Sequence, residues 1–129
     1  MTALLDTHTL LWQYWGNSQQ SHTAQQILGD PSNTIYVSVA SLWEITIKFS
    51  QGKLEIQNPI TVFFQDAVEG SDFRILPVER FHLFTLATLP LHHRDPFDRL
   101  LIAQSISEKM PIISADTAFD AYPDRKSVV

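Results

Sequence analysis

The chain has 129 residues, of which 44% are hydrophobic and 18% charged, a size and composition that fit one ordinary domain and exclude a disordered protein. The absence of cysteine excludes disulfides, zinc–thiolate sites, iron–sulfur clusters and cysteine nucleophiles. Nine Lys and Arg against 14 Asp and Glu give a net charge of −5, which argues against a general nucleic-acid coat protein. Any contact with nucleic acid should therefore be local and made through metal.

The sequence shows neither the basic start and apolar stretch of a signal peptide nor the run of about 20 apolar residues that a membrane span requires. It also lacks internal repeats, low-complexity stretches and Gly/Ser linkers. We therefore expect one domain over residues 1–129, cytoplasmic and without a membrane contact.

The first half of the chain alternates short apolar runs with segments of helical spacing. The pattern predicts a strand at 2–5, a helix at 10–15, a helix at 22–28, a strand at 34–37 and a helix that ends near Gln51. Ser38 or Ser41 can cap the last of these helices, and Ser41 also has capping-box spacing to Glu44. Strands and helices are thus expected to follow one another in turn.

The second half continues this alternation. It predicts a helix from Pro59 to about Glu69, a strand at 73–76, a helix at 79–88, a helix from Pro96 to about Lys109 with Asp95 as its N-cap, and a strand at 111–114. Such an order implies right-handed crossovers between parallel strands. We predict an α/β fold, a three-layer α/β/α sandwich with a short, mainly parallel sheet of four or five strands. Ligand sites in such sheets lie beyond the C-terminal ends of the strands.

Four carboxylates lie where this rule directs attention. Asp6 directly follows the first strand, Asp116 comes two residues after the last, and Glu44 and Asp98 lie in the first turns of two helices. All four can converge on one edge of a parallel sheet. Because converged carboxylates repel one another, the group would need cations, and hard Mg²⁺ or Mn²⁺ with oxygen ligands match that need. A pocket of this kind implies phosphate chemistry.

Each acid alone also has a structural interpretation. Asp6 can be an ordinary N-cap, and Glu44 can close the capping box or pair with Lys48 four residues on. Asp98 lies at a positive helix N-terminus, and Asp116 can cap a short helix at 117–121. The joint placement of the four acids, and not any one of them, favours a functional site.

Several segments carry a family resemblance. They are Leu-Leu-Asp-Thr-His at 4–8, Val-Ser-Val-Ala-Ser-Leu-Trp-Glu-Ile at 37–45, the segment 90–104 around Asp98, and Ile-Ser-Ala-Asp at 113–116. Together they resemble the PIN-domain family, and specifically the VapC-like toxin ribonucleases of bacterial toxin–antitoxin pairs. The resemblance spans about residues 3–122, and the segment around Asp98 is its most specific part.

The resemblance implies a Mg²⁺- or Mn²⁺-dependent endoribonuclease that hydrolyses RNA phosphodiester bonds with a metal-activated water. By motif, Asp6, Glu44, Asp98 and Asp116 match the family's acidic quartet of metal ligands and catalytic residues. Thr7 and Ser114 stand where the family often has polar helpers. The resemblance also implies a cognate antitoxin and a homodimer. The polar segment 124–129 departs from the family, in which another short strand commonly follows.

The basic residues near the expected site have two interpretations. His92, His93 and Arg94 can contact the RNA backbone, or they can simply form a solvated loop. Arg99 can hold phosphate or pair with Asp95. For Lys48, an ion pair with Glu44 is preferred over a phosphate contact.

Two other classes of protein stay open. One is a non-catalytic interaction module, in which the acids are caps and an aromatic surface binds a protein; its aromatic residues are Trp12, Tyr14, Trp15 and Trp43, of which at least half are expected in the core. The other is a phosphatase with an aspartate nucleophile. That class carries a second Asp two positions after the first, where this chain has His8, so it is the weaker alternative.

Overall fold

A short parallel sheet lies in the middle of the molecule, whose computed structural model describes residues 1–16, 20–92 and 95–115. Its strands are β1 (Thr2–Leu5), β2 (Thr34–Ser38), β3 (Arg74–Leu76) and β4 (Ile112–Ile113). They lie in the order β3-β2-β1-β4, and every pair is parallel. The predicted parallel sheet is confirmed, whereas the segment 124–129, on which a fifth strand depends, lies outside the described residues.

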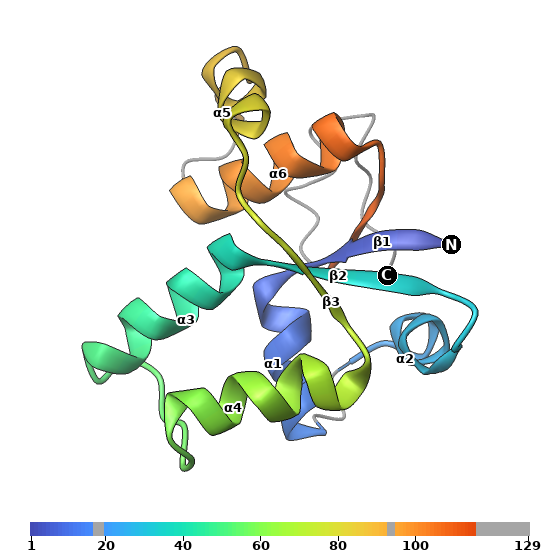
Figure 1. Cartoon of the computed structure of the whole chain (residues 1–129), viewed down its shortest axis with the longest axis vertical. Coiled ribbons are helices and arrows are strands. Elements are labelled where there is room, and N and C mark those ends of the chain that lie inside the picture. The colour runs from blue at the N-terminus through green and yellow to red at the C-terminus, as the bar shows by residue number, and fades with distance from the viewer. Residues whose placement is uncertain (17–19, 93–94, 116–129) are drawn as a thin grey trace.

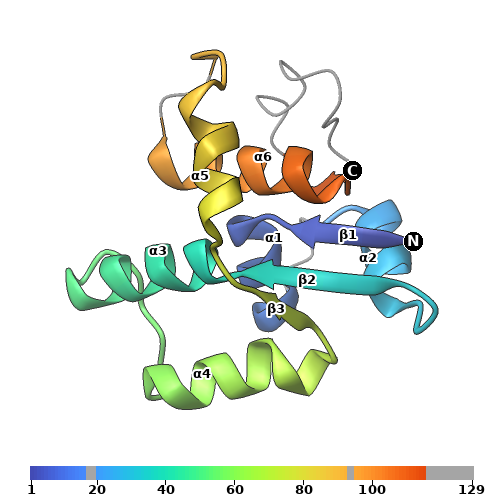
Figure 2. The ribbon, with the colours of Figure 1, turned by 45° about the horizontal axis from the view of Figure 1, so that its top comes forward.

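Helices cover both faces of the sheet. They are α1 (Thr7–Trp15), α2 (His22–Gly29), α3 (Val39–Ser50), α4 (Ile60–Ala67), α5 (Arg80–Ala87) and α6 (Pro96–Glu108), with a 3₁₀ turn η1 at Glu69–Ser71. Helices α5 and α6 lie on one face of the sheet, and α1 and α4 lie on the other (Figures 1 and 2). The three-layer α/β/α arrangement is therefore confirmed.

Alternation along β1 explains why the sheet is buried on both faces. Ala3 and Leu5 pack into the apolar core shared with α1, α2 and α4, whereas Leu4 points into a second core. That second core holds Leu101 and Ile102 of α6. A parallel strand covered by helices on both faces is apolar at successive positions, as the run at 2–5 is.

Local capping chemistry fixes where two of the helices begin. The Ser38 side chain accepts a hydrogen bond from the Ala40 amide over 3.0 Å, so Ser38 is the N-cap of α3. Ser41 lies inside the helix, and the predicted capping box between Ser41 and Glu44 is wrong for that reason. Asp95 is the N-cap of α6 and accepts from the amides of residues 97 and 98, as predicted.

The boundaries of the remaining elements differ from the predictions by a few residues. Helix α1 begins at Thr7 instead of residue 10, because the turn that starts there buries Thr7 and Thr9. Gly16 ends this helix with a positive φ of 66°, a conformation that glycine adopts at little cost. No helix in the described ranges is long and apolar enough to cross a membrane.

Of the four aromatic residues singled out from the sequence, two are partly buried and two are exposed. Tyr14 is partly buried and its ring packs on Phe63 at a centroid distance of 4.7 Å, and Trp12 is also partly buried. Trp15 and Trp43 are 48% and 57% exposed. The expectation that at least half of them lie in the core is not met, because of the four only Tyr14 packs against a core cluster.

Candidate active site

The C-terminal ends of β1 and β4 bring two polar residues together. Leu5 pairs with Ile113 in the sheet, so the residues that follow them, Asp6 and Ser114, are neighbours. The Ser114 hydroxyl donates a hydrogen bond to Asp6 Oδ2 over 2.8 Å, and both side chains are buried. The parallel register thus places the carboxylate of Asp6 where a ligand site was predicted.

Asp6 does not act as a helix cap. It occupies the N-cap position of α1, but its side chain makes no capping hydrogen bond. Asp6 is only 3% exposed, and its carboxylate is hydrogen-bonded to Ser114, which follows β4. Helix capping does not explain this arrangement. The structural interpretation of Asp6 as an ordinary N-cap is therefore not supported.

A second buried contact joins the starts of α1 and α3. The Thr7 hydroxyl donates to Ser41 Oγ over 2.9 Å. Glu44 lies three residues after Ser41, on the same face of α3. This contact fixes the position of the first turns of α3 relative to Asp6 at the end of β1.

Glu44 is buried and is paired with Lys48, as preferred from the sequence. Its side chain is 5% exposed, and its Oε2 lies 2.7 Å from the ammonium of Lys48. Its other oxygen, Oε1, is buried and makes no hydrogen bond in the described part of the chain. A buried carboxylate oxygen without a donor is costly unless a cation or a polar ligand reaches it.

Two carboxylates at the start of α6, Asp95 and Asp98, are close enough to Lys48 for their charge to affect its pKa. The hydrogen bond to Glu44 raises the pKa of Lys48 most, burial lowers it, and the charges of Glu44, Asp95 and Asp98 raise it further. Asp98 lies half-buried in the first turn of α6, next to the cap that Asp95 provides. We call the end of the sheet where Asp6, Glu44 and Asp98 lie the acidic edge.

The acidic edge fits a hard divalent cation by its donor chemistry. Its side chains offer carboxylate oxygens, and the Oε1 atom of Glu44 lacks a partner among the described residues. Within those ranges no three His, Asp or Glu side chains are close enough to form a metal site by themselves. Asp116, the fourth acid of the predicted quartet, lies outside the described residues.

The predicted RNA contacts are only partly described. Arg99 donates to the carbonyls of Leu89 and Pro90 over 3.4 and 3.2 Å, and so holds the loop before α6. His92 is exposed in that loop. His93 and Arg94 lie outside the described residues.

A hollow beside Asp6 is lined by two residues, His8 and Trp12, that were not predicted to belong to the site. The hollow has a volume of about 230 Å³ and is lined by Asp6, His8, Thr9, Trp12 and Ala115. The four-residue spacing of His8 and Trp12 places them on one face of α1, which is the signal that could have found them.

A buried hydrogen-bond network behind the acidic edge was also not predicted from the sequence. Gln104 of α6 accepts from the Ser38 hydroxyl over 2.5 Å and donates to the Pro77 carbonyl over 3.3 Å. Its amide nitrogen is 3.4 Å from Nδ1 of His82, and that Nδ1 accepts from the Glu79 amide. One side chain thus links the ends of β2 and β3 to α5 and α6.

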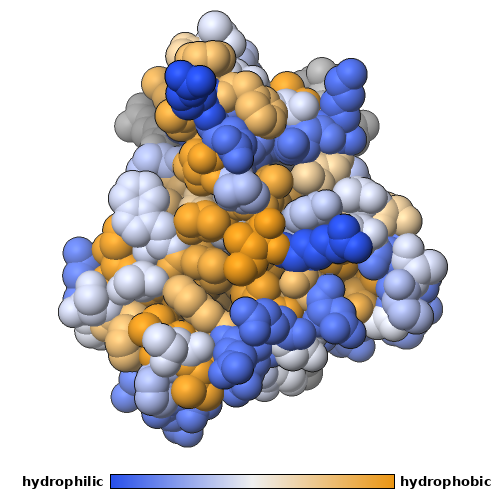
Figure 3. All heavy atoms as spheres, in the orientation of Figure 1, coloured by the Kyte–Doolittle hydropathy of each residue, from blue (hydrophilic) through white to orange (hydrophobic). Residues whose placement is uncertain are grey.

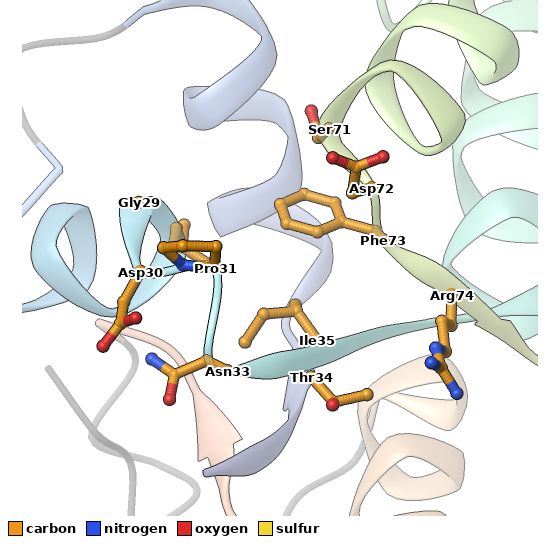
Figure 4. Close-up of a pocket in the computed structure, with 11 residues that line it drawn as sticks. Gly29, Asp30, Pro31, Asn33, Thr34, Ile35, Ser71, Asp72, Phe73 and Arg74 are labelled. Carbon is orange, nitrogen blue, oxygen red and sulfur yellow. The ribbon is translucent and has the colours of Figure 1, made fainter.

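A separate hollow of about 300 Å³ lies at the opposite end of the strands, where β2 and β3 begin (Figure 4). Phe73 and Ile35 lie at its centre, and Asn33, Asp72 and Arg74 at its margin. Because the predicted acids follow the strands' C-terminal ends, this hollow is not part of the acidic edge.

Comparison with known proteins identifies the family. The PIN domain family model matches residues 3–125, and the chain therefore belongs to the PIN domain family. Among curated proteins, none matches the chain.

Solved structures share the fold over nearly the whole chain. VapBC2 from Rickettsia felis bound to a promoter DNA fragment is similar with a TM-score of 0.70 and 16% identity, and 99% of this chain and 98% of that chain are covered. DNA-bound VapBC from Salmonella typhimurium has a TM-score of 0.72, 14% identity, and coverage of 99% and 97%. A toxin–antitoxin complex from Klebsiella pneumoniae has a TM-score of 0.62, 18% identity, and coverage of 97% and 96%.

Proposed function

We propose that this protein is a metal-dependent endoribonuclease and the toxin of a toxin–antitoxin pair. The observation that carries the proposal is the buried Asp6 carboxylate at the end of β1, which is held by Ser114 and is not used as a helix cap. Membership of the PIN domain family supports it. The solved structures that share the fold are toxin–antitoxin complexes, which supports the second half of the proposal.

Asp6, Glu44, Asp98 and Asp116 would hold Mg²⁺ or Mn²⁺. When bound, such an ion lowers the pKa of a coordinated water toward neutrality and offsets the negative charge that develops on a phosphodiester. The protein's own part is to hold carboxylates in place before substrate arrives. This assignment is consistent with the unpartnered Oε1 of Glu44.

Three sets of hydrogen bonds position Asp6 and the helices that carry Glu44 and Asp98. The Ser114 hydroxyl directs the carboxylate of Asp6. The contact between Thr7 and Ser41 holds α1 against α3. Asp95 caps α6 and leaves Asp98 in the first turn, where the positive end of the helix favours an ionised side chain. Thr7 and Ser114 would therefore act as positioning residues.

The hollow beside Asp6 offers space for the substrate. It opens next to Trp12 and His8, and an indole ring at such a position can stack on an unpaired base. RNA that approached here would bring its phosphates to the acidic edge. His92, His93, Arg94 and Arg99 remain candidates for contacts with the RNA backbone.

We also propose that the protein forms a homodimer and binds an antitoxin. The support is an apolar surface that runs over β3 and α5, which we call the β3–α5 face. It comprises the exposed residues Ile75 of β3 and Phe81 and Phe84 of α5, together with Val78 between them and Val39 at the start of α3. Apolar side chains gather in the middle of the surface shown in Figure 3. Contiguous exposed apolar patches of this kind commonly mark protein interfaces.

An RNA cleavage assay with Mg²⁺, Mn²⁺ and chelator tests the nuclease. Asp6→Asn should lose cleavage without unfolding, and Asp66→Asn, an exposed acid of α4, should keep it. Full activity of Asp6→Asn would refute the assignment. No metal-dependent cleavage by the wild type, with no rise of melting temperature in Mn²⁺, would favour the non-catalytic interaction module.

A further inference from the structure

Lys48 lies at the rim of the acidic edge. Its side chain is 43% exposed, whereas the side chain of Glu44 beside it is 5% exposed. The four-residue spacing puts the two on one face of α3, so the ammonium reaches back one turn to Glu44 Oε2 at 2.7 Å. A buried carboxylate is thus balanced by a cation that still touches solvent.

The ammonium of Lys48 pairs with one carboxylate, that of Glu44, and is also acted on by the charges of two others. Glu44 lies on its own helix, and the charges of Asp95 and Asp98 act on it from α6. Arg99 differs because its guanidinium is anchored on the carbonyls of Leu89 and Pro90. Lys48 has a flexible four-carbon stem and can leave its partner without any change of the backbone.

We propose that Lys48 is a side chain of this site that contacts phosphate. Without metal its ammonium is bound to Glu44 as a counter-ion, and it is released when a divalent cation binds the carboxylates. The proposal rests on the proposed nuclease function and assigns a substrate contact to the same site. A divalent ion carries twice the charge of the ammonium, and it repels the ammonium once both face Glu44. The released ammonium stays tethered at the rim, where a phosphate of the RNA is the anion that it can bind.

The first test measures cation binding without any RNA. Calorimetry with Mn²⁺ alone compares the wild type with Lys48→Gln and with Lys53→Gln, a matched control in which an exposed lysine just beyond α3 loses the same charge. Lys48→Gln should bind Mn²⁺ about fivefold to tenfold more tightly than the wild type, because a competing cation next to the carboxylates has been removed. Lys53→Gln should change the affinity by less than about twofold, because exposed charges farther away are screened.

The second test measures RNA binding in chelator, so that it requires neither metal nor cleavage. Fluorescence anisotropy follows a short labelled single-stranded RNA over a range of salt concentrations. Glu44→Gln removes the anchor of Lys48 and should steepen the log–log salt dependence by about 0.7, the contribution of one phosphate contact on a single strand. Adding Lys48→Gln should cancel that change. Asp98→Asn, which removes a negative charge but leaves the anchor in place, should not produce it.

Each outcome decides the role of Lys48. Lys48→Arg keeps a cation at the site and should retain the wild-type salt dependence, and far-UV circular dichroism checks that every variant is folded. The proposal would be overturned if Lys48→Gln and Lys53→Gln bound Mn²⁺ with equal affinity. It would also be overturned if Glu44→Gln and the double variant Glu44→Gln/Lys48→Gln had equal salt slopes. If no variant binds RNA with or without metal, the nuclease function itself fails, and the Mn²⁺ comparison still decides whether Lys48 competes with a cation.

Discussion

At the scale of single residues, the two neighbouring acids of α6 have different roles. Asp95 accepts from the amides of residues 97 and 98, over 2.9 and 3.2 Å, through the same oxygen. Asp98 is one turn further and provides no cap. A motif match alone cannot separate these two acids, but the hydrogen bonds that begin the helix can.

We predict that substitutions of Asp95 affect stability and spare most of the activity. Asparagine caps nearly as well as aspartate, so Asp95→Asn should cost at most about 0.5 kcal/mol of unfolding free energy, and Asp95→Ala should cost about 1 kcal/mol. Urea unfolding measures both. An inactive Asp95→Asn variant would indicate that Asp95, and not Asp98, is the metal ligand at the start of α6.

We predict the opposite behaviour for Asp98→Asn. Its melting temperature in chelator should stay near that of the wild type, because Asp98 provides no cap. Metal-dependent cleavage should be lost, since an amide contributes no charge to hold Mg²⁺ or Mn²⁺. Melting in chelator and cleavage in Mg²⁺ are the two measurements, and retained cleavage would exclude Asp98 from the site.

Ser114→Ala should destabilise the protein, because the Ser114 hydroxyl donates to the buried carboxylate of Asp6 over 2.8 Å. Hydrogen bonds to charged groups contribute about 1.5–3 kcal/mol. Ser114→Thr keeps the hydroxyl and should recover most of the loss in urea unfolding. Equal stabilities of the Ala and Thr variants would contradict a role of the hydroxyl in holding Asp6.

At the scale of elements, Gln104 joins parts of the fold that are distant in sequence. It is fully buried and contacts Ser38 at the start of α3, Pro77 after β3, and His82 of α5. Helices α3 and α6 carry Glu44 and Asp98. The spacing of these two helices therefore depends on a buried amide as well as on apolar packing.

We predict that Gln104→Leu lowers the unfolding free energy by about 1–3 kcal/mol, the cost of leaving buried polar partners unsatisfied. The side chain keeps a similar size, so a cavity is not the cause. Gln65→Leu, at an exposed position of α4, is the matched control. A cost no larger than that of the control would show that water or rearrangement satisfies Ser38 and Pro77.

At the scale of the whole molecule, β3 is the outer strand of the sheet on the side away from β4. Ile75 in this strand is 46% exposed, and Phe84 of α5 is 69% exposed. An edge strand beside an exposed apolar helix is a surface that a partner commonly covers. The β3–α5 face is therefore the proposed contact between two copies of the chain.

We predict that Ile75→Glu dissociates the dimer, because it places a charge in the middle of the proposed apolar contact. Sedimentation at micromolar concentrations should show a dimer for the wild type and a monomer for the variant. Val62→Glu makes the same change on α4, where Val62 is 37% exposed, and should leave the dimer intact. A monomeric wild type would refute the dimer, and a dimeric Ile75→Glu would place the contact elsewhere.

The local sequence determined much of the fold because its signals act over a few residues. Apolar runs predicted all four described strands, and Asp95 followed by Pro96 predicted the start of α6. The choice between Ser38 and Ser41 as the cap of α3 required the structure, since both serines satisfy the local rule. The structure shows that the helix begins at Val39 and that the Ser38 side chain accepts from the Ala40 amide.

Tertiary structure alone decided which polar groups meet. The contacts of Asp6 with Ser114, of Thr7 with Ser41, and of Gln104 with Ser38 span 108, 34 and 66 residues of sequence. They arise from the strand order β3-β2-β1-β4, which no local pattern encodes. The sequence by itself determined the elements and the candidate acids, because propensity and capping are short-range. Packing decided which buried carboxylate receives a hydroxyl and which a lysine, because those partners are set by the register of the sheet and the docking of helices upon it.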